Sequence, residues 1–268
     1  MIGLPGTSLI AFATAAAIGC LASAAAALTP EEVKEKGTLV VGVLADFPPF
    51  GGTDANQQPV GFDNDIAALL AAKMGVKLEM VQVTGPNRIP YLLTNRIDML
   101  IAALGINAER AKQVAFSNPY STLDIMVMAP KSVELTEPAG LKNYVVGVTR
   151  AGSQDTFLSA VAPDGTDIRR FDDDAISLQA MISRQIEVLG GSSIHLAVLN
   201  RDHPELQMER KFPLHSQGNG IGLRTEDEAP LAYVNDFVAE IVANGELDKV
   251  HRTWFGAPLP ELPPLPQF

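Results

Sequence analysis

Few side chains in this 268-residue sequence are spaced for catalysis or metal binding. The four histidines, His195, His203, His215 and His251, form no HxH, HExxH or HxxxH pattern, so a histidine-based metal site is not expected. The single cysteine, Cys20, excludes a disulfide framework and a multi-cysteine zinc site. No GxGxxG, P-loop or GxSxG motif supports nucleotide binding or serine hydrolysis. We therefore expect neither a metal nor another cofactor.

Arginine side chains are the groups with the clearest chemical use. A carboxylate that leaves water needs a replacement for its hydration, and a guanidinium with backbone N–H groups at a helix start is the strongest one. Arg88 and Arg110 could serve in this way, but each could equally be a solvated helix arginine or pair with a nearby acid. The residue types alone leave both explanations open.

The net charge limits the partners. The chain has 20 Lys+Arg against 31 Asp+Glu, a formal charge of −11, and no basic cluster that could neutralise a row of phosphates. Nucleic-acid binding is therefore not expected. With 47% hydrophobic residues, the chain can bury a core of one or two domains.

Two blocks of alternating strand and helix patterns must position these side chains. The first block predicts strands over 37–44, 76–80 and 98–102 and helices over 63–74, 87–95 and 107–112, with Asp63 and Asn107 as N-caps. The second predicts strands over 123–129, 144–148, 168–171 and 186–189, and helices from Ser153, from Asp173 or Asp174 to Ser183, and over 193–199. A Gly-rich strand over 218–224, helices over 226–246 and 247–254 and an extended proline tail over 258–266 follow. This alternation predicts two α/β lobes with mainly parallel sheets.

The N-terminal residues are typical of an export signal. Residues 1–28 have no charged side chain, and the run from Leu9 to Leu28 is apolar and Ala-rich. Small residues at 22–27 favour cleavage, for example after Ala26 or Ala27, over retention as a membrane anchor. Lipidation at Cys20 is less favoured, because alanine stands three residues before it where a lipobox usually has leucine. We expect a periplasmic protein whose mature chain lacks cysteine, as suits an oxidising envelope.

Six short segments between residues 37 and 256 carry a family resemblance. They are Gly37-Thr-Leu-Val-Val-Gly-Val, Gly61-Phe-Asp-Asn-Asp-Ile, Asn87-Arg-Ile-Pro-Tyr-Leu-Leu, Arg96-Ile-Asp98, Glu109-Arg110-Ala-Lys-Gln-Val-Ala-Phe-Ser-Asn-Pro-Tyr120 and Asn244-Gly-Glu-Leu with Trp254-Phe-Gly256. Each is weak alone, but together and in this order they closely resemble the periplasmic solute-binding proteins of the polar amino acid family (family 3), including its glutamate/aspartate-binding members. These proteins are the extracytoplasmic receptors of ABC importers.

The resemblance implies an α/β fold of the type II periplasmic binding proteins. Two lobes, each a mainly parallel sheet flanked by helices, would be joined by two hinge strands and close on a ligand in the cleft. Lobe 1 would comprise residues 37–127 plus 222–256, and lobe 2 residues 130–220. A signal peptide would occupy residues 1–27 and a Pro-rich tail residues 257–268. The resemblance implies a monomer that delivers its ligand to an inner-membrane ABC permease.

The resemblance also assigns the two arginines. Arg110 in the Glu-Arg motif matches the arginine that clamps the ligand's α-carboxylate. Asn87-Arg-Ile-Pro is similar to the segment whose arginine reaches the side-chain carboxylate in glutamate/aspartate-binding members, which would give this role to Arg88. Two arginines on facing walls of the cleft would suit a dianion.

Other matched positions would complete the site. Phe47 would pack against the ligand, or be a core residue. Thr149 and Ser153 would give hydroxyl and N–H donors to the ligand carboxylate. Weaker candidates for ligand binding are Leu44, Arg150 and Asp174. The last of these has a local explanation as a helix N-cap, and Arg150 could be solvated.

Two departures from the family pattern affect the ligand. The family usually has Thr or Ser after the strand of lobe 1, whereas this chain has Ala103-Leu-Gly105, which retains only backbone contacts. The family's aspartate for the α-ammonium falls at Ser192. Either Asp46, Asp172 or Asp174 replaces that acid, or the ligand is a carboxylate without an amine, such as a dicarboxylic acid.

Three functions are compatible with the sequence. The first is a non-enzymatic receptor for an acidic or polar amino acid, or a related carboxylate. The second is an enzyme similar to cyclohexadienyl dehydratase, which would need a general acid; Asp46, Asp172 to Asp174 and Glu187 are available but lie in no diagnostic motif. The third is a periplasmic sensor. The leader, the two lobes and the missing catalytic motifs favour the first.

Overall fold

The computed structural model describes residues 29–268. The predicted signal peptide at 1–27, its cleavage after Ala26 or Ala27 and the possible lipidation at Cys20 lie outside the described residues. From residue 29 onward, every helix is too short or too polar to cross a membrane.

The first lobe is built on a five-stranded sheet in the order β4-β1-β5-β12-β6. Its strands are β1 (Thr38–Leu44), β4 (Lys77–Val83), β5 (Met99–Leu100), β6 (Ala115–Phe116) and β12 (Gly222–Leu223). The pairs β1–β4 and β1–β5 are parallel, whereas β12 runs antiparallel to both of its neighbours. Four strands therefore point in one direction, and the residues at their carboxyl ends meet at one edge of the sheet.

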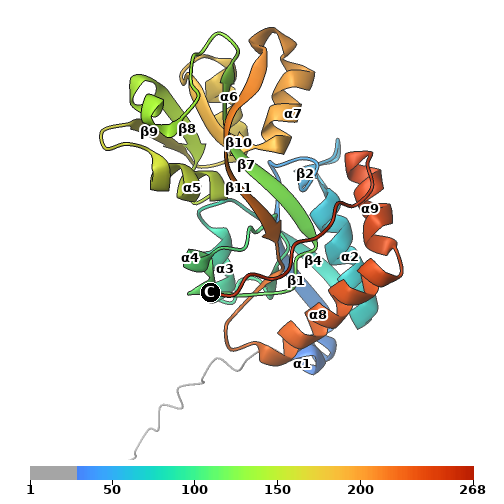
Figure 1. Ribbon diagram of the computed structural model, residues 1–268. Helices are drawn as coiled ribbons and strands as arrows, with labels where there is room; N and C mark the ends of the chain where they lie inside the picture. The colour runs from blue at the N-terminus through green and yellow to red at the C-terminus, as the bar shows by residue number, and fades with distance from the viewer. Residues whose placement is uncertain (1–28) are drawn as a thin grey trace, which may run out of the picture.

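Six helices belong to this lobe (Figure 1). They are α1 (Pro30–Lys36), α2 (Phe62–Met74), α3 (Arg88–Leu93), α4 (Ala108–Ala111), α8 (Glu228–Ala243) and α9 (Glu246–Phe255). A small hairpin of β2 (Gly52–Thr53) and β3 (Pro59–Val60) precedes α2. Strand β1 is apolar on both faces because both faces are covered, and its residues from Val41 to Leu44 are all buried.

The second lobe contains the other five-stranded sheet, in the order β11-β7-β10-β8-β9. Its strands are β7 (Ser121–Pro130), β8 (Val145–Thr149), β9 (Asp167–Phe171), β10 (Val188–Ser192) and β11 (Met208–Asn219). Its helices are α5 (Ser153–Val161), α6 (Asp174–Ile182) and α7 (Ser193–Asp202), with 3₁₀ turns at η1 (Pro138–Asn143) and η2 (Pro204–Leu206). Again four strands share one direction, since only β7 runs against its neighbours.

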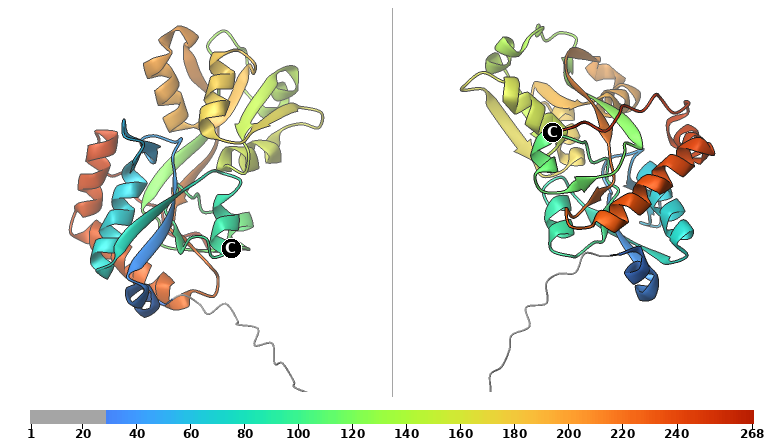
Figure 2. Two further views of the ribbon diagram at one scale, coloured as in Figure 1. Left: turned by 180° about the vertical axis from the view of Figure 1, so that it is seen from behind. Right: turned by 60° about the horizontal axis from the view of Figure 1, so that its bottom comes forward.

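Strands β7 and β11 are the two hinge strands between the lobes. They pair antiparallel from Ser121 opposite Asn219 to Pro130 opposite Met208. Both extend from the second lobe down to the first, as the front and back views show (Figures 1 and 2). The protein thus has the two-lobed α/β architecture that the family resemblance implied.

Two buried clusters cover the two faces of the second lobe's sheet. In the second lobe, alternate residues of β7 enter different clusters: Val127 packs with Leu158 of α5, whereas Met126 and Met128 pack with Leu199 of α7. This alternation is the normal consequence of strand geometry and shows that the sheet is covered on both faces.

The C-terminal segment lies against the hinge. After α9 it forms no helix or strand and runs across β7 and β11 toward α4 (Figure 1). Leu259 and Leu262 pack on the core of the first lobe, and the Leu259 N–H donates to Asp248 Oδ1 at 2.8 Å. A shallow hollow there is lined by Thr122 and Ser216 of the hinge together with tail residues 261–264.

One predicted cap is wrong. Helix α2 begins after Gly61, and Asp63 lies inside the helix with its side chain fully buried. Its carboxylate accepts hydrogen bonds from the Ala103 N–H at 2.7 Å and the Tyr120 hydroxyl at 2.8 Å. Gly61 has φ 149°, and a Cβ there would lie 2.3 Å from the Phe50 carbonyl oxygen, so only glycine fits at this helix start.

The structure also tests two other predicted caps and the predicted ends of one strand and one helix. Asn107 caps α4, and its Oδ1 accepts from the Arg110 N–H at 2.9 Å, as predicted. Of the two acids considered for α6, Asp173 is the N-cap. The single strand predicted over 218–224 is wrong: β11 ends at Asn219 and β12 is a separate short strand. The helix predicted over 226–246 ends at Ala243 because Gly245, with φ 81°, separates it from α9.

Candidate functional site

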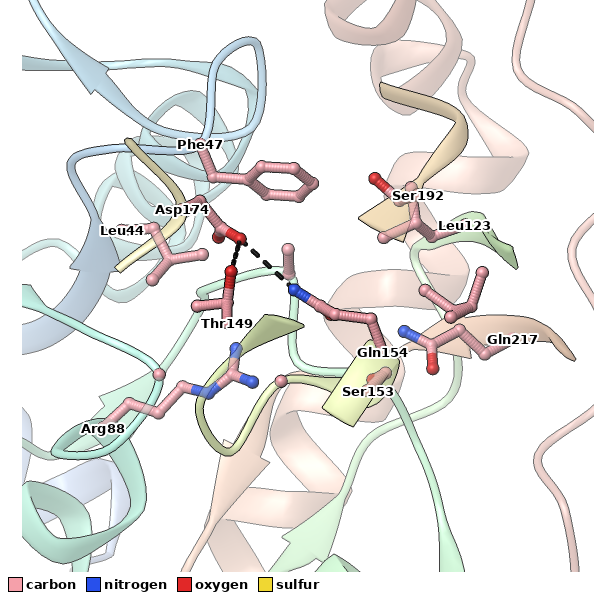
Figure 3. A pocket seen from close by; sticks show the side chains of 14 residues that line it. Leu44, Phe47, Arg88, Leu123, Thr149, Ser153, Gln154, Asp174, Ser192 and Gln217 are labelled. Atoms are coloured by element: carbon pink, nitrogen blue, oxygen red, sulfur yellow. Dashed lines mark hydrogen bonds between the residues drawn. The ribbon is translucent and has the colours of Figure 1, made fainter. Parts of the chain in front are cut away.

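A pocket lies between the two lobes, at the edge where the carboxyl ends of both sheets meet. It has an empty volume of about 420 Å³, part of which is open to solvent. Clefts at this edge are the usual ligand sites of α/β sheets. Its lining residues are Leu44, Phe47, Gly85, Arg88 and Ala103 of the first lobe, Thr149, Gly152, Ser153, Gln154, Asp174 and Ser192 of the second, and Leu123, Ile125 and Gln217 of the hinge strands (Figure 3).

Eight of the residues proposed from the sequence line this pocket: Leu44, Phe47, Arg88, Ala103, Thr149, Ser153, Asp174 and Ser192. Gly105 and Arg110 lie beside it, with the Arg110 Nη1 group donating to both the Gly105 carbonyl at 2.8 Å and the Ser153 hydroxyl at 3.1 Å. Arg150 is directed elsewhere: it is exposed and pairs with Asp172 at 3.2 Å. Its predicted contact with the ligand therefore has no geometric support.

Arg88 is the cation of the pocket. It is the first residue of α3, is 5% exposed and donates from Nη1 to the Ala102 carbonyl at 2.8 Å. Its Nε has no hydrogen-bond partner among the described residues. Burial lowers the pKa of Arg88, and attraction by Asp174 and Asp46 opposes this effect. The guanidinium thus keeps hydrogen-bonding capacity for a ligand (Figure 3).

The backbone beside Arg88 is held in an unusual conformation. Ala103 has φ 44°, in the left-handed region that alanine rarely adopts. The buried Asp63 carboxylate accepts the Ala103 N–H, and burial raises the pKa of Asp63 to about 7. Asp63 therefore fixes the turn whose preceding carbonyl orients Arg88, and strained backbone of this kind is typical of binding sites.

Asp174 is the anion of the pocket. Its Oδ1 accepts from the Thr149 hydroxyl at 2.6 Å and the Gln154 amide at 3.2 Å (Figure 3). It also lies 3.2 Å from His195 Nε2. Burial alone would raise the pKa of Asp174, but the attraction and hydrogen bond of His195, followed by the hydrogen bond from Thr149 and attraction by Arg88, outweigh burial and hold it below the usual value. The carboxylate is therefore ionised at neutral pH.

Asp46 reaches across the cleft from the first lobe to the second. Its Oδ2 accepts the Asp174 backbone N–H, at the start of α6, at 2.7 Å. Burial, followed by repulsion from Asp174, raises the pKa of Asp46 to about 6. Its Oδ1 is buried without a hydrogen-bond partner in the described structure. This contact joins the two lobes directly.

Arg110 makes a second connection between the lobes. Besides Gly105 on its own lobe, its guanidinium donates to Ser153 and, at 2.9 Å, to the Ala151 carbonyl. Burial and the positive charge of Arg88 lower the pKa of Arg110 well below its usual value. Because Arg88 and Arg110 come from α3 and α4 of the same lobe, the expectation that they lie on facing walls is wrong.

The start of α5 faces the pocket. Gly152 is the N-cap and makes no side-chain cap, so the first N–H groups of the helix have no intrahelical partner. Gly152, Ser153 and Gln154 all line the pocket. This arrangement can bind a carboxylate through backbone N–H groups, as expected for Ser153.

The sequence reasoning missed several lining residues, including both glutamines. Gln154 directly follows Ser153 at the predicted helix start, so its place in the sequence could have identified it as a lining residue. Gln217 lies on hinge strand β11, where no sequence motif marked it, and His195 reaches Asp174 from α7. The contact between His195 and Asp174 joins two helices of the second lobe, and Gln217 reaches the pocket from a hinge strand, so both depend on tertiary packing.

Comparisons with known proteins agree with this architecture. Residues 39–257 match the bacterial extracellular solute-binding proteins, family 3. The L-cystine-binding protein TcyJ of Escherichia coli K12 is 30% identical over 229 residues, which cover 84% of this chain and 85% of that protein. A crystal structure of a solute receptor for L-cysteine from Neisseria gonorrhoeae has a TM-score of 0.79 at 27% identity, covering 84% of this chain and 93% of that one. The ancestral amino acid-binding protein AncCDT-1, a precursor of cyclohexadienyl dehydratase, has a TM-score of 0.76 at 29% identity, covering 84% and 99%.

Proposed function

The chain belongs to family 3 of the bacterial extracellular solute-binding proteins, and we propose that it is the periplasmic receptor of an ABC importer for an amino acid. The amino acid binds as a zwitterion in the pocket between the lobes. A membrane permease then receives it from the closed protein. The names of the relatives, which include cystine-, arginine- and histidine-binding proteins, support an amino acid as the ligand class.

The observation that carries this proposal is the pair of opposite charges in one pocket. Arg88 and Asp174 are both buried, and both line the pocket. Arg110, to which the family resemblance assigned the α-carboxylate, already donates to Gly105, Ser153 and Ala151. We therefore place the α-carboxylate at Arg88 and the first N–H groups of α5, where charged and dipolar donors replace its lost hydration. An α-ammonium placed at Asp174 finds an ionised acceptor. A zwitterion thus matches both charges of the site.

Asp174 can also replace the acid that the family resemblance leads us to expect at Ser192. Ser192 lines the pocket and caps α7 with its hydroxyl, so it supplies no charge. Asp174 lines the same pocket, whereas Asp172 is exposed and paired with Arg150. We therefore assign Asp174 the role of the missing acid. A dicarboxylate without an amine would bring a second carboxylate toward Asp174 and Asp46 and is disfavoured.

Three hydrogen bonds that cross the cleft support a closing motion. We take residues 37–127 plus 222–256 as one moving body and residues 130–220 as the other. Asp46 to the Asp174 N–H and Arg110 to Ala151 and Ser153 are bonds that form only when the bodies meet. Rotation about β7 and β11 would break them and open the pocket.

A thermal-shift screen of the purified protein, stripped of ligand by unfolding and refolding, tests the proposal. The panel contains the twenty amino acids and cystine, each paired where possible with its amine-free analogue: aspartate with succinate, glutamate with glutarate, cysteine with 3-mercaptopropionate. A ligand at a hundred times its Kd adds about 2.7 kcal/mol of stability. Stabilisation by an amino acid and not by its analogue is expected; stabilisation by analogues alone contradicts the zwitterion.

A dehydratase is a second candidate because of Asp46. A carboxyl group with its pKa raised to about 6 beside the cleft can act as a general acid: it protonates a ring hydroxyl, which leaves as water while the ring carboxylate leaves as CO2 and its bonding pair makes the ring aromatic. Incubation with prephenate-like acids, followed by detection of the aromatic product, tests this function. Turnover that is lost in Asp46→Asn would support it, and no turnover by the wild-type protein would exclude it for these substrates.

Export and permease coupling have separate tests. Cell fractionation with mass spectrometry of the N-terminus would locate the mature protein and the cleavage site. Uptake of the identified amino acid should require both this protein and an ABC permease. A receptor that left uptake unchanged when deleted, but altered a signalling response, would favour a sensor.

A further inference from the structure

We propose that Gln217 is a specificity-determining residue whose side-chain oxygen accepts a hydrogen bond from an N–H or O–H group of the ligand. The proposal rests on the amino-acid pocket described above. Gln217 lies in hinge strand β11, is 4% exposed and lines the pocket (Figure 3). Its Oε1 is buried and has no hydrogen-bond partner among the described residues.

The orientation of the amide is set by its neighbours. Gln217 Nε2 donates to Asn219 Oδ1 at 3.1 Å, and Asn219 Nδ2 donates to the Ser121 hydroxyl at 3.0 Å. Asn219 is fully buried, so this chain of hydrogen bonds is shielded from water. Because Asn219 uses its amide nitrogen on Ser121, its oxygen faces Gln217 and the Gln217 oxygen is left as the free end.

Gly105 makes room for this amide. A Cβ at Gly105 would lie 2.1 Å from Gln217 Nε2 and 2.4 Å from Oε1. Residue 105 belongs to the segment after the first-lobe strand where the family resemblance led us to expect Thr or Ser. In this protein, a side chain from the hinge thus occupies space that any side chain at position 105 would take.

A buried acceptor without a donor is costly, and a ligand that supplies the donor removes that cost. Ligands able to donate to Gln217 should therefore bind more tightly than isosteric ligands that lack the donor. One such hydrogen bond changes affinity by about tenfold. Gln217 and Ser121 lie on the two paired hinge strands. The Gln217 amide that selects the ligand is therefore attached to the strands about which the lobes move.

The test measures dissociation constants for ligand pairs that differ by one donor: threonine with valine, glutamine with methionine, and each amino acid with its amine-free analogue. The variants are Gln217→Met, which keeps the size and removes the amide, and Gly105→Ala, which displaces it. Ser216→Ala, an exposed neighbour on the same strand, is the matched control. The melting temperature of each unliganded variant reports folding.

We expect the wild type and Ser216→Ala to prefer the donor-bearing member of at least one pair by about tenfold. Both Gln217→Met and Gly105→Ala should abolish that preference while leaving the preference in other pairs unchanged. A uniform loss across all pairs, or preferences that persist in both variants, would overturn the specificity role. Failure of the wild type to bind any amino acid would instead overturn the proposed function.

Discussion

The charge on a single side chain, Asp174, is central to the proposed ligand preference of this pocket. The proximity of His195, a hydrogen bond from Thr149 and the positive charge of Arg88 keep it ionised despite burial. No sequence motif could rank Asp174 above Asp46 or Asp172, because the ranking depends on which acid faces the cleft. Ser192, by contrast, was identified from the sequence as the position where the family resemblance leads us to expect an acid.

Asp174→Asn tests this role. The substitution keeps the size and the acceptor oxygen for Thr149 but removes the charge that faces the α-ammonium. We expect amino-acid affinity to fall by about tenfold to a hundredfold, measured by calorimetry, and the affinity of an amine-free analogue to stay equal or rise. Asp172→Asn, at an exposed position, is the control. Equal losses for both ligand types would contradict an ammonium contact.

Asp46 predicts a pH dependence of stability. Its pKa is raised from 3.8 to about 6 in the folded protein, so between these pH values the folded state binds more protons than the unfolded state. Its contribution to stability is therefore fully present below about pH 4 and is lost as the pH rises through about 6. Asp46→Asn keeps an oxygen for the Asp174 N–H and cannot ionise.

The free energy of unfolding, from urea titrations at pH 4 and pH 8, checks this prediction. The two proteins should be nearly equal at pH 4, and Asp46→Asn should be more stable at pH 8 by on the order of 2 kcal/mol. The comparison between variants cancels the other titrating groups, including Asp63. A difference that is the same at both pH values would show that Asp46 does not titrate in this range.

At the scale of elements, helix starts place most of the polar groups of the site. Arg88 begins α3, Ser153 begins α5 and Asp174 begins α6. The helices themselves could be predicted from apolar spacing and caps, and Asn107 was identified in this way. Asp63 was misassigned because its position before an apolar run is typical of a cap, whereas burial against Ala103 and Tyr120 is a tertiary effect.

The cap of α6 should contribute to stability separately from binding. Asp173 Oδ1 accepts the Ile176 N–H at 2.7 Å. Asp173→Ala should lower the free energy of unfolding by about 1 kcal/mol, because a helix N–H loses its partner. Chemical denaturation measures the change, with Asp172→Ala as a neighbouring control. If both substitutions have the same effect, the loss comes from removing negative charge and not from the cap.

At the scale of the whole molecule, the two lobes and their connection follow from repeated strand and helix patterns. The order of the blocks and the family resemblance were sufficient to predict two α/β lobes joined by two strands. The contacts between the lobes could not be predicted from sequence: Asp46 meets Asp174 and Arg110 meets Ala151 only after both lobes have folded. Gln217 could not be predicted either, because its place in the pocket depends on the folded arrangement of hinge strand β11.

Closure should be visible in solution. Binding of an amino acid should reduce the radius of gyration measured by X-ray scattering, because the lobes close about β7 and β11. Arg110→Ala removes the bonds to Ser153 and Ala151 and should leave a larger radius at saturating ligand. Lys112→Ala, an exposed residue near α4, serves as the control. An unchanged scattering profile with ligand bound would count against hinge closure.

The central claim is that one amino acid lies between Arg88 and Asp174, and a crystal structure of the protein with the tightest ligand from the screen tests it most directly. We expect that structure to show the α-carboxylate at the Arg88 guanidinium and the start of α5, with the α-ammonium within hydrogen-bonding distance of Asp174. A ligand bound outside the pocket, or bound with its ammonium away from Asp174, would contradict it.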